Sequence, residues 1–336
     1  MLHSQKEMSE NKPGFLTGTR NHVLDLDDFS LEELDLLFTT TDEMHTVLNQ
    51  DKKKLAVLQG KIIVTLFCEP STRTRLSFEE AGKILGADVI NISSQGSSVE
   101  KGESLLNTML TIQATGADII IIRHPHSGAP HFIARHLNSS KVINAGDGLH
   151  AHPTQALSDL YTMKSHLGHL ANRKVVIVGD ILHSRVARSN LWGLLLIGAR
   201  VVLCGPPTLL PKEFLRGDHR KNGHHLAKIE VEMNLDKAIE GAAAIMALRL
   251  QTERQDDGFL PSLREYSKMY AITPERLKTA QTRAILMHPG PMNEGVEISP
   301  DVAHGPQSVI EEQVNNSVAI RMSLLKLLLN PTGKIQ

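Results

Sequence analysis

The sequence predicts an α/β protein with two doubly wound parallel-sheet domains joined by helices. Short runs rich in β-branched residues recur along the chain, separated by segments long enough for a crossover helix. Such alternation predicts parallel strands that are buried on both faces. The chain has 336 residues, which at about 150 residues per domain is enough for two separate cores. Two sheets therefore fit the recurring strands better than one.

The expected elements follow one another in a regular order. A helix should begin near Ser30 and reach about Leu48, because Ser30 and Glu33 have the spacing of a capping box. The strands of the first sheet should be Lys61–Phe67, Asp88–Ser93, Ala117–Arg123 and Lys141–Ala145. A helix over residues 152–168, with apolar residues at helical spacing, should bridge the domains, and another over residues 314–329 should close the fold. The strands of the second sheet should be Lys174–Asp180, Ala199–Gly205, Lys228–Met233, Ala243–Leu248 and Ala284–His288.

Composition excludes several classes of function. Lys and Arg total 36 against 37 for Asp and Glu, so no global positive field exists to gather nucleic acid or anionic lipid. The longest apolar stretch, residues 191–205, is interrupted by Arg200 and glycines and does not read as a membrane helix. Cys68 and Cys204 lie in apolar strand-like runs, which favours a reducing compartment over a disulfide framework. With no signal-peptide pattern at the start, a cytoplasmic protein without a nucleic acid or membrane partner is expected.

The most informative segment is Phe67–Arg75, which follows an expected strand and opens an expected helix. At such a junction, main-chain N–H groups, hydroxyls and guanidinium groups point outward together, and the helix dipole adds to the attraction for an anion. The segment therefore predicts a phosphate cradle without a glycine loop. The alternative is a helix cap with two solvated arginines.

Two further cations accompany this cradle. Lys101 lies in the polar segment Ser97–Glu103, from which a lysine can swing onto a dianion; the alternative is an ordinary surface loop. Arg123 ends the third expected strand, at the carboxyl edge where open α/β sheets bind ligands. The alternative for Arg123 is a salt-bridged edge residue.

The segment His152–Gln155 begins the bridging helix, with Pro153 in the first turn. A histidine there can donate a hydrogen bond to a carbonyl oxygen and polarise it, while a glutamine can hold an amide nitrogen. His150 and His152 could instead be half of a zinc site, but we find no cysteine or acidic residue at a recognisable spacing to complete it. No metal and no cofactor are therefore expected.

The second sheet carries candidates for binding carboxylates. Gly179-Asp180 ends a strand, yet the glycines of a dinucleotide-binding fingerprint do not follow it. Arg185 and Arg249 can each hold a carboxylate by bidentate pairing, with Gln251 beside the second of them. The alternative for Arg249 is an ion pair with Glu253, four residues on.

The last expected strand ends in the turn His288–Pro291. Its two prolines make the turn rigid, so that it can present main-chain carbonyls, and Pro291 is a candidate for a cis peptide bond. The alternative is a plain loop.

Taken in this order, these segments resemble the catalytic chains of the aspartate carbamoyltransferase family over residues 15–330. The motifs Ser71–Arg75 and His152–Gln155 mark the wider carbamoyltransferase family. Lys101–Glu103, Arg249–Gln251 and the absence of cysteine in the turn His288–Pro291 point to the aspartate branch. The ornithine branch usually carries a cysteine in that turn.

The resemblance implies transfer of the carbamoyl group of carbamoyl phosphate to the amine of L-aspartate, giving N-carbamoyl-L-aspartate and phosphate in de novo pyrimidine biosynthesis. It implies that residues 1–150 and 317–336 form the carbamoyl phosphate-binding domain and that residues 151–316 form the aspartate-binding domain. The implied phosphate ligands are Ser71, Thr72, Arg73, Thr74 and Arg123, with Ser97 and Lys101 from a neighbouring subunit. The implied groups around the carbamoyl moiety are Thr74, Arg123 and His152 on the oxygen, and Gln155, Pro289 and Gly290 on the nitrogen. The implied aspartate ligands are Lys101, Arg185, Arg249, Gln251 and Gly290.

Shared sites in the family imply a homotrimer, while the sequence leaves open a larger assembly with regulatory chains or a dihydroorotase. Two other functions stay open: carbamoyl transfer to another amine such as ornithine, and a non-catalytic assembly subunit. The latter would be expected to lose Arg73, Lys101 or His152, and all three are present. Three positions depart from the family pattern: Cys68 stands where many relatives have Phe, Gly290 replaces the Leu of some members, and Glu294 stands where arginine is common. The reversed charge at Glu294 is expected to weaken aspartate binding or alter a subunit contact.

Overall fold

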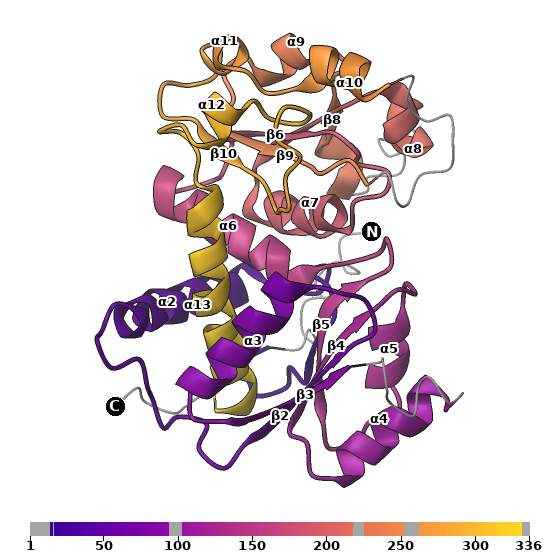
Figure 1. The fold of residues 1–336 in the computed structure, drawn as a ribbon, viewed down its shortest axis with the longest axis vertical. Coiled ribbons are helices and arrows are strands. Elements are labelled where there is room, and N and C mark those ends of the chain that lie inside the picture. Colours follow the sequence, from indigo (N-terminus) through magenta and orange to yellow (C-terminus); the bar gives the residue numbers. More distant parts are fainter. Residues whose placement is uncertain (1–13, 16, 94–102, 218–224, 252–261, 331–336) are drawn as a thin grey trace, which may run out of the picture. The chain divides into compact units, whose positions relative to one another are not determined.

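The computed structural model describes residues 14–15, 17–93, 103–217, 225–251 and 262–330. The chain divides into two compact units: unit 1 is Met1–Thr154 with Asn316–Gln336, and unit 2 is Gln155–Asn315. Each unit contains a five-stranded sheet whose strands are all parallel. The expected fold class is therefore confirmed (Figure 1).

The sheet of unit 1 has the strand order β1-β5-β4-β2-β3. Its strands are β1 (His22–Val23), β2 (Ile62–Phe67), β3 (Asp88–Ser93), β4 (Ile119–His124) and β5 (Lys141–Asp147). The two-residue strand β1 was not expected, because so short a run carries no periodicity; pairing of His22 with Val142 and of Val23 with Ile143 creates it. Because all five strands are parallel, their carboxyl ends meet at one edge.

Helices cover both faces of this sheet. Figure 1 shows α3 on one face and α4 with α5 on the other. The helices of unit 1 are α2 (Leu31–Leu48), α3 (Thr72–Ile84), α4 (Leu105–Ala114) and α5 (Ala129–Ala134). The expected capping box is present in α2, since the Ser30 side chain accepts from the Glu33 N–H and the Glu33 carboxylate accepts from the Ser30 N–H.

The sheet of unit 2 has the strand order β10-β9-β6-β7-β8. Its strands are β6 (Lys174–Val178), β7 (Arg200–Cys204), β8 (Glu230–Val231), β9 (Ala244–Ala247) and β10 (Ile285–Met287). The expectation for β8, Lys228–Met233, was wrong in its length, because η3 (His225–Lys228) winds as a 3₁₀ helix up to the strand. As an edge strand, β8 pairs only with β7, so few residues have a partner.

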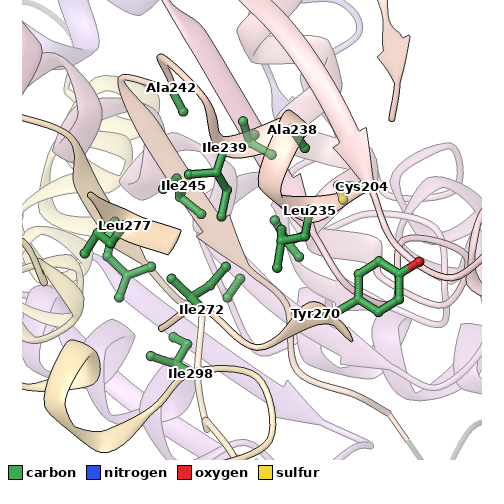
Figure 2. Close-up of a cluster of buried hydrophobic side chains, with 14 of the residues drawn as sticks. Cys204, Leu235, Ala238, Ile239, Ala242, Ile245, Tyr270, Ile272, Leu277 and Ile298 are labelled. Carbon is green, nitrogen blue, oxygen red and sulfur yellow. The ribbon is translucent and has the colours of Figure 1, made fainter. Parts of the chain in front are cut away.

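Short helices enclose the second sheet. They are α7 (Arg185–Ile197), η1 (Pro207–Leu209), α8 (Lys212–Leu215), α9 (Leu235–Ile239), α10 (Leu263–Tyr270), α11 (Pro274–Leu277) and α12 (Pro300–Ala303). Figure 1 shows α7 and α9 on opposite faces of the sheet. Figure 2 shows part of the core on the α9 side, where Leu235 and Ile239 gather with Ile245 of β9 and with Ile272. Gly198 ends α7 with a φ of 83°, which divides the longest apolar run into a helix and a strand.

Two helices continue across the limits of the units: α6 (Pro153–Leu167) and α13 (Ile310–Leu329). The expected bridging helix thus lies within one residue of α6 at each end. The closing helix begins at Ile310 and not at residue 314, because Glu311 and Glu312 in its first turn stabilise a helix N-terminus. Within the described ranges, no helix has the length and apolar character needed to cross a membrane.

Candidate active site

The start of α3 leaves polar groups available around its N-terminus. Ser71 occupies the N-cap position with extended backbone, yet within the described chain its side chain makes no capping hydrogen bond. The first turn contains no acidic residue. Thr72 and Arg73 are exposed, whereas Thr74 is only 5% exposed. Main-chain N–H groups, hydroxyls and a guanidinium therefore meet at one helix N-terminus, at the carboxyl end of β2.

Arg123 lies beside this junction. Its carbonyl oxygen accepts from the Cys68 N–H at 2.8 Å, which places the carboxyl end of β4 next to the segment after β2. The guanidinium donates to the Glu69 carboxylate at 2.6 Å and to the Ala145 carbonyl at 3.2 Å. The salt bridge expected as the alternative is thus present, and it holds a buried guanidinium next to the N-terminus of α3.

His152 is buried, and a turn anchored by Asp147 leads to it. The Asp147 carboxylate accepts from the Ala151 N–H at 3.0 Å, the Asn144 side chain at 2.8 Å and the Gly128 N–H at 2.6 Å. Burial alone would raise the pKa of the Asp147 carboxyl, but the hydrogen bonds that it accepts hold this pKa below its ordinary value. An ionised, fully buried carboxylate therefore fixes the chain immediately before His152.

In unit 2, Asp159 joins Gln155 to the turn after β10. Its Oδ1 accepts from the Gln155 side chain at 2.8 Å and from the Gln313 side chain at 2.9 Å. The amide oxygen of Gln313 in turn accepts from the His288 N–H at 2.9 Å. Asp159 also accepts from the Asn190 side chain at 2.8 Å. Gln155 and the turn His288–Pro291, both of which the family resemblance implies around the carbamoyl nitrogen, thus lie in one hydrogen-bond network.

The turn His288–Pro291 is tightly shaped. The Gly290 N–H donates to His288 Nδ1 at 2.8 Å, and Gly290 has a φ of 61°, a conformation that favours glycine. The Gly290–Pro291 peptide bond is cis, which confirms the expectation for Pro291. Pro289 and Gly290 are half-buried, so the carbonyl-rich turn keeps a partly open surface.

Arg185 and Gln251 lie on neighbouring segments of unit 2. Arg185 opens α7 and is 5% exposed. The segment before it is held by Asp180, whose Oδ1 lies 2.8 Å from His183 Nδ1. The Gln251 side chain donates to the His183 carbonyl at 3.1 Å. The structure therefore brings Gln251 to the loop that presents Arg185.

The buried carboxylate of Glu297 holds the segment Arg249–Gln251 through a hydrogen bond to its main chain. This carboxylate is 1% exposed and accepts from the Leu250 N–H at 2.9 Å, the Asn293 N–H at 2.6 Å and the Asn293 side chain at 2.7 Å. Burial alone would raise the pKa of Glu297, but the nearby His288 imidazole and the hydrogen bonds from Leu250 and Asn293 hold this pKa below its ordinary value. Glu297 thus ties the loop after β9 to the loop after β10.

Three of the residues named from the sequence are not described by the structure, and Glu294 lies at the surface. Ser97, Lys101 and Glu253 lie outside the described residues, so their roles stay predictions. Glu294 is exposed, and its Oε1 lies 3.3 Å from His304 Nε2, which gives its charge a local partner.

The sequence did not single out Asp159 and Glu297 as positioning residues. Asp159 did carry a signal, since it lies between Leu157 and Leu160 in an apolar stretch where an acidic residue needs a buried partner. Glu297 had no comparable signal, because its partners lie in two loops.

Known proteins resemble the chain over nearly its full length. Residues 21–165 match the family described as aspartate/ornithine carbamoyltransferase, carbamoyl-P binding domain, and residues 171–328 match its Asp/Orn binding domain. The chain is 54% identical over 311 residues to the aspartate carbamoyltransferase catalytic subunit of Chloroflexus aggregans, covering 92% of this chain and 98% of that protein.

Solved structures share the fold. Aspartate transcarbamoylase from Trypanosoma cruzi, in complex with carbamoyl aspartate and phosphate, has a TM-score of 0.81 at 27% identity, covering 95% of this chain and 99% of that one. Ornithine carbamoyltransferase from Pyrococcus furiosus has a TM-score of 0.80 at 27% identity, covering 94% and 98%. Because both score alike, the fold does not by itself choose the amine substrate.

Proposed function

Because the chain belongs to the aspartate/ornithine carbamoyltransferase family, we propose that it transfers the carbamoyl group of carbamoyl phosphate to the amine of L-aspartate. The products are N-carbamoyl-L-aspartate and phosphate, in de novo pyrimidine biosynthesis. The observation that carries the choice of aspartate is the Arg249–Gln251 segment, held by Glu297 and joined through Gln251 to the loop of Arg185. Two guanidinium groups and an amide suit the two carboxylates of aspartate.

Unit 1 binds the phosphate of carbamoyl phosphate. The ligands are Ser71, Thr72, Arg73, Thr74 and Arg123, joined by Ser97 and Lys101 from a neighbouring subunit. What supports this assignment is the N-terminus of α3, whose Ser71 side chain does not cap the helix, together with the buried guanidinium of Arg123 beside it. A dianion there gains main-chain N–H donors and the helix dipole as well as charge.

The reaction needs a polarised carbonyl more than an enzyme nucleophile, since the carbonyl already carries a good leaving group. Thr74, Arg123 and His152 donate to the carbamoyl oxygen as negative charge develops on it. Each such donor lowers the barrier by about 3 kcal/mol when it is already in position. The anchored turn before His152 supports this role, because it fixes the main chain that leads to the imidazole.

Gln155 and the carbonyls of Pro289 and Gly290 hold the carbamoyl nitrogen. The Gln155 amide nitrogen donates to the Asp159 carboxylate. The amide oxygen of Gln155 therefore points away from Asp159 and can accept an N–H of the carbamoyl group. The network through Gln313 supports a fixed placement of the carbonyls in the same unit. The departing phosphate then accepts the proton of the attacking amine.

A parallel assay with L-aspartate and L-ornithine tests the substrate. We expect phosphate release from carbamoyl phosphate only when L-aspartate is present, because an ornithine side chain would bring its positive charge against Arg185 and Arg249. Turnover with ornithine and none with aspartate would overturn the choice of substrate. Turnover with neither would favour the non-catalytic assembly subunit, which the presence of Arg73 and His152 disfavours.

We also propose a homotrimer in the cytoplasm. Leu76 on α3 and Ile90 on the edge strand β3 are large apolar side chains that are 60% and 50% exposed, and a contact between subunits through unit 1 would remove them from water. The free thiols of Cys68 and Cys204 support a reducing compartment. Larger assemblies with regulatory chains or a dihydroorotase are open.

Mixing inactive variants tests the shared site. Chains carrying Arg73→Ala and chains carrying Lys101→Ala should each be nearly inactive, because each lacks a phosphate ligand at every site. Mixed trimers should regain part of the activity through interfaces at which both residues are wild type. Absence of any recovery, with trimers confirmed by size measurement, would show that the sites are not shared.

A further inference from the structure

A cluster of two histidines and an aspartate lies at the end of β5, apart from the groups assigned to the reaction. Its members are His131 of α5, Asp147 at the end of β5 and His150 in the following turn. One ligand atom from each residue lies within 4.8 Å of the other two. All three belong to unit 1, so their arrangement is internal to one unit.

The aspartate of this cluster is rigidly held. Asp147 is fully buried, and its oxygens accept from Asn144, Ala151 and the N–H of Gly128, the N-cap of α5. Its Oδ2 also lies 3.1 Å from His150 Nδ1. Surrounding hydrogen bonds of this kind orient a metal-ligating carboxylate.

The second histidine is the feature that a simple ion pair leaves unexplained. His150 and Asp147 form a pair by themselves, but the His131 ring stands edge-on to the His150 ring, with centroids 5.3 Å apart. The Nδ1 atom of His131 is buried and makes no hydrogen bond within the described chain. A buried ring nitrogen without a hydrogen-bond partner calls for an explanation, and a bound ion would supply one.

We propose that His131, Asp147 and His150 bind one divalent transition-metal ion, with Zn²⁺ as the best fit. Two imidazoles and one carboxylate are the borderline donors that zinc takes, and a three-residue set leaves a fourth position for water. In a tetrahedral zinc site the ligand atoms are about 3.4 Å apart, so small side-chain rotations close the cluster around an ion.

More acidic than basic residues act on the cluster. Asp25 and Asp27 lie near enough to act electrostatically on His150, while Asp27 and the cation Arg135 both act on His131. The His150 side chain is 41% exposed, so an ion can enter from solvent. The site differs from the His150 and His152 pair considered from the sequence, because Asp147 and His131 supply the ligands that the sequence spacing did not reveal.

Metal binding would act on the structure next to the reaction. The turn from Asp147 to Ala151 closes through hydrogen bonds in both directions and leads directly to His152. An ion that bridges this turn to α5 would stabilise one conformation of it. The ion is therefore assigned a structural role and takes part in no step of the carbamoyl transfer.

The test uses the full chain, stripped with a chelator and then titrated with Co²⁺, a zinc substitute whose visible absorption reports its ligands. We expect one Co²⁺ per chain, displaced by Zn²⁺, and about a 100-fold weaker affinity in His131→Gln and in His150→Gln. The matched control is His136→Gln, an exposed histidine just beyond α5 and outside the cluster, which should bind as the wild type does.

Thermal unfolding distinguishes metal binding from damage to the fold. Without metal, the two cluster variants and the control should unfold close to the wild-type temperature. With Zn²⁺, only the wild type and His136→Gln should gain thermal stability, because an ion that binds the native state alone raises its stability. A wild type that takes up no Co²⁺, or a His131→Gln chain that binds it equally well, would overturn the proposal.

Discussion

Asp147 in unit 1 and Glu297 in unit 2 are buried carboxylates that hold loops in the same way in two different environments. Each is a carboxylate at most 1% exposed, and each accepts from main-chain N–H groups of two separate segments. In each case burial would raise the carboxyl pKa, and hydrogen bonds lower it instead. Both therefore act as ionised anchors that hold loops near the ends of parallel strands.

The difference lies in the imidazoles around them. Glu297 faces His288, whose side chain is completely buried, at 3.7 Å, whereas Asp147 faces His150, whose side chain is 41% exposed. Glu297, whose histidine neighbour is buried, can only position the residues around it. Asp147, whose histidine neighbour reaches solvent, can also take part in binding a ligand from solution. The two buried carboxylates therefore differ in the solvent access of their imidazole neighbours, which is present at Asp147 and absent at Glu297.

The largest effect on catalysis should come from removing one expected ligand of each substrate, Arg73 for carbamoyl phosphate and Arg249 for aspartate. Arg73→Ala should lower kcat/KM about 100-fold or more and abolish phosphate binding, because it removes a cation from the start of α3. Arg249→Ala should mainly raise KM for aspartate. Substrate-saturation kinetics distinguish the two, and unfolding of Arg73→Ala should stay within about 0.5 kcal/mol of wild type, since its side chain is exposed. Loss of folding in Arg73→Ala would favour a purely structural role.

Removing the anchor of unit 2 should have the next largest effect. Glu297→Ala leaves the buried N–H group of Leu250 and the part-buried N–H group of Asn293 without an acceptor, which should lower the free energy of unfolding by about 3 kcal/mol. The KM for aspartate should rise, while that for carbamoyl phosphate changes little. Urea unfolding and kinetics measure both effects.

The matched control for this substitution is Glu294→Ala. Glu294 is a nearby glutamate in the same loop but is exposed, so its removal should change the free energy of unfolding by no more than about 0.5 kcal/mol. Equal losses in the two variants would show that Glu297 is not an anchor.

The lowered pKa values of both anchors predict a dependence of stability on pH. Near pH 4 the native state binds fewer protons than the unfolded chain, so the free energy of unfolding should rise with pH there. This contribution is complete above the ordinary carboxyl pKa, about 4, and is lost as pH falls through the lowered native values. Urea unfolding between pH 3 and 6, as an order-of-magnitude window, should show a smaller slope for Glu297→Gln than for wild type. An unchanged slope would contradict the anchor role.

The smallest effect is expected at Glu294, one of the positions that depart from the family pattern. Glu294→Arg removes an exposed contact with His304, and exposed pairs contribute less than about 1 kcal/mol. Titration with aspartate should show a change in KM of about twofold or less if the family arginine has no role at this exposed site. A large gain in affinity would instead support the expectation that Glu294 weakens aspartate binding.

Much of the fold was accessible from the sequence because its signals are local. The strands other than β1 and β8 appear within two residues of their expected ends, since each is a short run that contains several β-branched or other apolar residues. The cap at Ser30 and the junction at Ser71 depend on residues three or four positions apart. Periodicity gave no warning of β1, because two residues have no period.

The sequence by itself determined the parallel α/β architecture and the strand-to-helix junction at Ser71, and it predicted the phosphate site there and the arginines that suit a dicarboxylate. Only the tertiary structure decided which buried groups hold these residues in place. Gln313 and Asp159 are 154 positions apart and Glu297 and Leu250 are 47 apart, and nothing in the local pattern specifies such pairs. The same holds for His131 and Asp147, which come from a helix and a strand. Hydrophobic patterning specifies which face is buried, whereas polar partners within the core follow from register and loop path.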